Sequence, residues 1–136
     1  MEAESHPIAA VGMAELSLDR DDPGRAILLA ERVLRQVPLA NKTQRAAPLE
    51  LAVRAKSAAG DAHTARIHLE ELRSVAQAVP TGPLRAAVSF CDGVVAAAAG
   101  DHESAAVAFD DAAALFAASD APYELGRART RSWHGR

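Results

Sequence analysis

Apolar residues recur every three or four positions along most of this chain. After Asp101 they stand at Ala105, Ala108, Phe109, Ala112, Leu115 and Phe116. After Asp61 they stand at Ala65, Leu69, Leu72, Ala76 and Val79. This spacing is typical of an amphipathic helix with one buried face. It predicts seven helices, at 7–19, 23–37, 43–59, 61–79, 83–99, 101–118 and 121–133.

A short motif repeats between these helices. Ala58-Ala59-Gly60-Asp61 returns forty positions later as Ala98-Ala99-Gly100-Asp101, and Asp21-Asp22-Pro23 is a weaker copy upstream. Glycine accepts the left-handed conformation that ends a helix, and aspartate caps the next one. Such a tight corner makes the two flanking helices antiparallel neighbours.

The corners therefore divide the chain into helix hairpins. We expect one domain over residues 1–136, with hairpins at 7–37, 43–79 and 83–118 and a capping helix at 121–133. A four-helix bundle could use the same helices, but it gives no reason for a motif at a fixed interval, so a stacked repeat is favoured. Pro48 lies inside the third expected helix, which should either kink or start late.

The repeated residues resemble the tetratricopeptide repeat. Starting at Ala86, the third hairpin has the residue types of that motif at Gly93, Gly100, Ala105, Phe109 and Ala112. The second copy keeps Gly60, Ala65 and Leu69, and the first keeps Ala14, Ala26 and Pro38. The resemblance implies an all-α, right-handed superhelical stack of about three antiparallel hairpins plus the C-terminal capping helix. The repeat is longer than the roughly 34 residues of that motif, so a HEAT-like array is the structural alternative.

A narrower resemblance lies near the C-terminal end. The segments 112–116 and 121–129 are similar to the repeat region of LuxR-type (MalT-like) bacterial transcription regulators, in which the repeats lie between an ATPase module and a DNA-binding helix-turn-helix. This sequence has no phosphate-binding loop and no recognition helix after the repeats. The resemblance implies a sensor or scaffold segment linked to bacterial transcription regulation.

Composition narrows the class and the compartment. Hydrophobic residues make up 49% of the chain but aromatic ones only 4%, so alanine and leucine carry the apolar content and favour helices. A net charge of -3 argues against direct nucleic-acid binding. A single cysteine, an acidic N-terminus and the lack of a long apolar stretch predict a cytoplasmic protein with no membrane contact.

Candidate chemistry is sparse. His63 and His68 are five residues apart and so fall on different helix faces, and we expect the histidines to be exposed or near helix caps. Cys91 stands on the apolar stripe of its helix, as a small buried hydrophobe would. We therefore predict no enzyme activity, no metal site and no cofactor.

With no catalytic or metal site predicted, we expect the chain to act by binding another molecule at its surface. In tetratricopeptide stacks the first helix of each pair lines a concave groove, and the resemblance assigns groove positions in the second and third pairs. In the second pair these are Ala47, Glu50, Arg54, Ser57 and Ala58, and in the third Ala87, Phe90, Val94, Ala97 and Ala98. The helix at 83–99 is apolar nearly all round, so we expect Phe90 and Val94 to face away from their hairpin partner.

The predicted function is a protein-interaction or effector-sensing module. An apolar peptide segment or a small effector would be buried around Phe90, with Glu50 and Arg54 giving polar specificity. The alternative is a self-assembling dimeric scaffold with no separate ligand, in which a second copy covers the apolar face.

Overall fold

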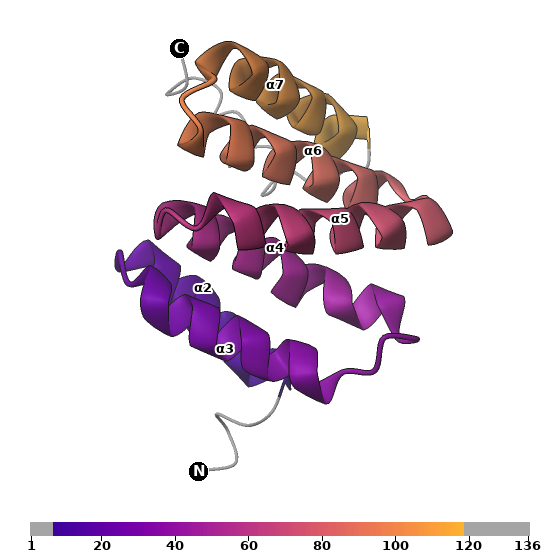
Figure 1. The fold of residues 1–136 in the computed structure, drawn as a ribbon. Helices are drawn as coiled ribbons and strands as arrows, with labels where there is room; N and C mark the ends of the chain where they lie inside the picture. The colour runs from indigo at the N-terminus through magenta and orange to yellow at the C-terminus, as the bar shows by residue number, and fades with distance from the viewer. Residues whose placement is uncertain (1–6, 119–136) are drawn as a thin grey trace.

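The computed structural model describes residues 7–118, and every regular element in that range is a helix (Figure 1). The elements are α2 (Pro7–Asp19), α3 (Pro23–Gln36), α4 (Lys42–Ala58), α5 (Ala62–Ala78), α6 (Gly82–Ala98) and α7 (His102–Ala118). The all-α class is confirmed, and each helix lies within two residues of its expected range. The expected capping helix at 121–133 lies outside the described residues.

One corner joins the two helices of each pair, and the three corners share one geometry. The second residue after the first helix adopts a positive φ, which is 62° at Asp21 and 84° at both Gly60 and Gly100. The next amide then donates to the carbonyl five residues earlier: from Asp61 to Lys56 at 2.8 Å and from Asp101 to Ala96 at 2.9 Å. This is the Schellman arrangement, which satisfies carbonyls that the helix end would leave without a donor.

The aspartate after each corner residue caps the second helix. Asp22 accepts from the Arg25 amide at 3.2 Å and Asp101 from the Ser104 amide at 3.1 Å. Asp61 accepts from both the amide and the hydroxyl of Thr64, and these hydrogen bonds lower the pKa of its carboxyl. The predicted glycine stop and aspartate start are confirmed, with Asp21 taking the glycine position in the first corner.

The hairpins lie on one another as three layers: α2 with α3, α4 with α5, and α6 with α7 (Figure 1). Between layers α3 packs on α4 and α5 packs on α6, and the first helices also touch, α2 with α4 and α4 with α6. Apolar clusters fill the seams. The largest, between α4, α5 and α6, includes Leu49, Val53, Leu69, Leu72, Val75 and Cys91.

Small residues set how closely the helices of a pair approach. Ala26, Ala65 and Ala105 each come four residues after a capping aspartate, and all are fully buried. In the third pair Gly93 faces the Phe109 ring so closely that an added Cβ would lie 2.5 Å from it. The glycine therefore makes the space that the ring fills.

Pro48 does not delay the start of its helix. α4 begins at Lys42 and continues through Pro48, so the late start is excluded. The side chain of Arg45, one turn earlier, is buried and faces neighbouring elements. Its Nη1 donates to the carbonyls of Leu34 (2.8 Å) and Val37 (2.7 Å), and its Nε and Nη2 donate to the Glu71 carboxylate. This arginine joins the end of α3 to α4 and α5.

Candidate functional site

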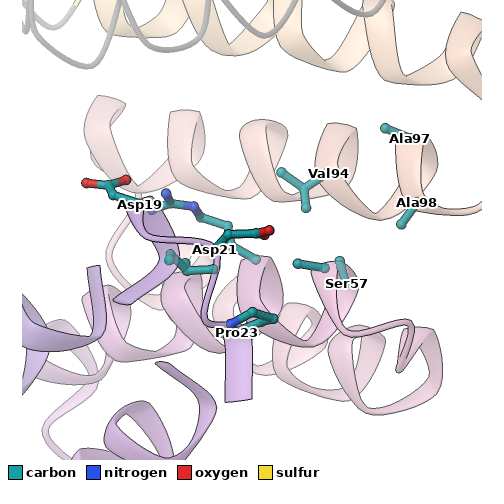
Figure 2. A pocket seen from close by; sticks show the side chains of 10 residues that line it. Asp19, Asp21, Pro23, Ser57, Val94, Ala97 and Ala98 are labelled. Atoms are coloured by element: carbon teal, nitrogen blue, oxygen red, sulfur yellow. The ribbon is translucent and has the colours of Figure 1, made fainter. Parts of the chain in front are cut away.

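A cavity of ≈ 430 Å³ lies where the last turns of α2, α4 and α6 meet, beside the first corner (Figure 2). Val94, Ala97 and Ala98 line it from α6. Arg54, Ser57 and Ala58 line it from α4. Leu18 and Asp19 from α2, with Asp21 and Pro23 after it, complete the wall. The first helices of all three pairs therefore contribute to one hollow.

The repeat explains why these positions meet. Counted back from the capping aspartates, Leu18, Ser57 and Ala97 occupy the same position, four residues before the cap. Asp19, Ala58 and Ala98 occupy the position three residues before it. Because the three corners fold alike, the same face of each last turn points into the same hollow. The repeat therefore places equivalent backbone positions around the cavity, and the side chains at these positions determine its chemistry.

Arg54 is the unusual residue of this cavity. It is 7% exposed, and its Nε has no hydrogen-bond partner among residues 7–118. The hydroxyl of Ser57, one turn later on α4, is also buried and has no partner within the same residues. A buried donor without an acceptor costs about 1–3 kcal/mol, and more when it is charged. Each of these two donors on one helix face therefore lowers the stability of the fold.

Acidic groups line the same cavity. Asp19 and Asp21 are exposed residues at one side of it, as Figure 2 shows. The C-terminal ends of α2, α4 and α6 also meet here, and a helix carries partial negative charge at that end. The cavity therefore combines one buried cation with a negative rim.

Six of the ten predicted groove residues line the cavity. These are Arg54, Val94 and Ala97, with Ser57, Ala58 and Ala98. Ala47, Glu50 and Ala87 do not line it. Ala87 is partly buried against the central apolar cluster, and Glu50 is half-buried on the preceding turn of α4.

The expectation for Phe90 was wrong. Its side chain is 1% exposed and packs on Phe109 of its own hairpin partner, with ring centroids 5.5 Å apart and planes tilted by 49°. Val94 also belongs to this apolar cluster, although one side of it reaches the cavity. Phe90 cannot contact a ligand in the cavity directly, because its side chain is buried in the apolar cluster between α6 and α7.

Four cavity residues were missed by the sequence analysis. They belong to the first pair: Leu18, Asp19, Asp21 and Pro23. The resemblance to the tetratricopeptide repeat assigned groove positions in the second and third helix pairs only. The distance back from each capping aspartate would have placed Leu18 and Asp19 beside Ser57 and Ala58.

Other candidate chemistry has structural explanations. Cys91 is fully buried, and burial raises the pKa of its thiol well above the ordinary value, which makes it a poor nucleophile. Residues 7–118 contain no cluster of three histidine, cysteine or acidic side chains that could hold a metal ion.

His68 is half-buried rather than exposed, which corrects the expectation for it. Its Nε2 lies 2.9 Å from the ammonium of Lys56, which in turn lies 2.7 Å from Glu31. An ammonium only donates, so Nε2 accepts and the ring is neutral. Burial and the charge of Lys56 lower the pKa of His68. His6 and His134 lie outside the described residues.

Within residues 7–118, no helix has the length and apolar character needed to cross a bilayer. Comparison of the chain with protein-family models, with curated proteins and with solved structures gives no match.

Proposed function

We propose that this chain is a helical repeat module that binds a partner or a small effector in the cavity between α2, α4 and α6. The observation that carries the proposal is the cavity that all three first helices build, with the buried Arg54 in its wall. A chain that only needed to fold would be more stable with an apolar side chain there.

The proposed architecture is a right-handed, tetratricopeptide-like superhelical stack. Contacts between successive first helices support it, because they place α2, α4 and α6 along one face. The fit of Gly93 against Phe109 and the small residues at Ala65 and Ala105 also match the tetratricopeptide pattern. The repeat length of about 40 residues is closer to a HEAT-like array, which stays the alternative.

The biological setting is proposed from the resemblance alone. A module of this kind would act in the cytoplasm as the sensing or scaffold segment of a bacterial transcription regulator of the LuxR type. It would have no catalytic role, and it would contact neither nucleic acid nor a membrane directly. The apolar character of α6 supports a binding role only through Val94 and Ala97, since Phe90 is buried.

A photo-crosslinking amino acid at position 98 tests the proposal. Ala98 is exposed and lines the cavity, whereas Leu16 on α2 is 47% exposed and does not line it, so position 16 is the matched control. After irradiation in the cells that produce the protein, intact mass spectrometry should show an added mass at position 98 and none at position 16. No adduct at position 98 would contradict the proposal.

The same experiment separates the alternative function. A crosslinked product with the total mass of two chains, together with a dimer in light scattering, would favour a self-assembling scaffold. An adduct with another protein or with a small molecule would favour the binding module.

A further inference from the structure

The second helices carry exposed aliphatic side chains at one and the same position of the repeat. Leu28 of α3, Ile67 of α5 and Val107 of α7 each come six residues after the aspartate that caps their helix. Their exposed fractions are 68%, 54% and 59%. One exposed aliphatic residue is ordinary on a folded protein, but the same exposure in all three copies of a repeat indicates a shared surface.

This surface lies on the side of the stack away from the first helices. The first helices contact one another from layer to layer, α2 with α4 and α4 with α6. Each second helix packs on its own partner, and α3 and α5 also pack on the first helix of the next layer. The opposite sides of α3, α5 and α7 therefore form an outer surface. We call this surface, with Leu28, Ile67 and Val107 on it, the second-helix face.

The charge of the second-helix face differs between the two ends of the stack. α3 contains three arginines and one acidic residue, Glu31, which lies 2.7 Å from the ammonium of Lys56 on α4. α7 contains three acidic residues and neither arginine nor lysine. Arg32 and Asp111 each follow the exposed aliphatic residue of their helix by four positions, so each lies one turn beyond it on the same side. Equivalent positions at the two ends thus have opposite charges.

A second copy of this chain matches both patterns. Two copies related by a two-fold axis parallel to the second helices face each other with the order of the layers reversed. α3 then lies against α7 of the second copy, and α5 lies against its own equivalent. Leu28 meets Val107, and Ile67 meets Ile67. Arg32 meets Asp111, and this pair occurs twice because the interface is symmetric.

The charges distinguish this arrangement from the other symmetric one. A two-fold axis along the stack would place α3 on α3 and α7 on α7. Such a dimer would bring arginines together at one end and carboxylates together at the other, and like charges oppose association. Complementary charges therefore favour the reversed order of layers.

From these observations we propose that the second-helix face binds a second copy of this chain, with α3 of each copy against α7 of the other. The three aliphatic residues supply the apolar part of the interface, and the pairs of Arg32 with Asp111 fix the order of the layers. The dimer uses none of the residues that line the cavity, so it goes beyond the proposed function and does not depend on it.

Light scattering at chain concentrations from about 1 to 500 µM tests the dimer, since a small interface gives a Kd in the micromolar range. The wild-type chain should change from monomer to dimer within this range. Ile67→Glu should abolish the dimer, because it places two carboxylates together at the two-fold axis. Circular dichroism should show unchanged helix content, since Ile67 is exposed. Leu16→Glu is the matched control: Leu16 is an exposed aliphatic residue of the first helix α2, and its replacement should leave the dimer intact.

Charge reversal tests the order of the layers. Arg32→Glu and Asp111→Arg should each raise the Kd by about tenfold or more at low salt, because each brings like charges together at both contacts. An equimolar mixture of the two variants should recover the wild-type Kd. In the mixed dimer, both contacts again join a cation to a carboxylate.

Three results would overturn the inference: a wild-type chain that stays monomeric up to about 500 µM, a dimer that Ile67→Glu leaves intact, or a mixture of the two charge variants that stays monomeric. None of these results concerns the cavity. The proposed function is tested separately by the adduct at position 98.

Discussion

The buried arginine that joins three helices should show strong energetic coupling to its carboxylate. Arg45 has a side-chain exposure of 7%, and its guanidinium binds Glu71 of α5 as well as two carbonyls at the end of α3. Replacing Glu71 by alanine leaves this cation in place with no opposing charge. The loss should therefore exceed that of an ordinary ion pair at the surface.

The magnitude follows from the exposure of the two partners. Breaking a fully buried ion pair costs about 3–5 kcal/mol. Glu71 is 31% exposed, so water can reach the site and reduces the expected loss for Glu71→Ala to about 2–3 kcal/mol. In an Arg45→Met background the same change should cost less than about 0.5 kcal/mol, because Glu71 then has no buried charge to oppose.

Urea unfolding followed by circular dichroism measures all four members of this double-mutant cycle. Glu70→Ala is a matched control on the adjacent position. The side chain of Glu70 is 73% exposed beside a partly exposed Arg73, so its loss should cost less than about 0.5 kcal/mol. Equal losses for Glu71→Ala in the two backgrounds would refute the reasoning, as would a loss no larger than that of the control.

Three further predictions concern single positions. Asp21→Gly should raise the free energy of unfolding by about 1 kcal/mol in thermal or urea denaturation, because glycine removes the strain of a positive φ; a loss of stability would show that the Asp21 side chain stabilises the corner. Gly93→Ala should destabilise the third hairpin by about 1–3 kcal/mol, since the new Cβ would overlap the Phe109 ring, and Phe109→Leu should recover part of that loss. Because the pKa of His68 is lowered in the folded state, the unfolded chain takes up a proton near pH 6.5 more readily than the folded chain does. The stability that is present above this pH is therefore lost as the pH falls toward the folded pKa. His68→Gln should make the free energy of unfolding depend less on pH in this range.

The helices could be predicted from sequence because their ends are set locally. Gly60, Asp61, Gly100 and Asp101 fix where one helix stops and the next begins, and the hydrogen bonds of each corner span no more than five residues. Residues that are close in sequence determine this geometry, so a pattern read along the chain is sufficient. The same is true of the small residue four positions after each cap.

The interior of the site was harder to predict. α6 is apolar on more than one face, and periodicity does not say which face meets α7. Phe90 was assigned to the groove, but the space left by Gly93 brings the Phe109 ring toward α6, and Phe90 packs on that ring. The Arg45–Glu71 pair joins residues 26 positions apart, which no local spacing reveals.

The corners also have a consequence for how the protein reaches its native state. Each of them is closed by hydrogen bonds between near neighbours in the chain, so each can form before the rest of the molecule has collapsed. A chain rich in such local contacts has little loop-closure entropy to overcome and folds fast for its length. Nucleation can therefore begin at any of three separate turns, and loss of one slows the formation of its own hairpin most.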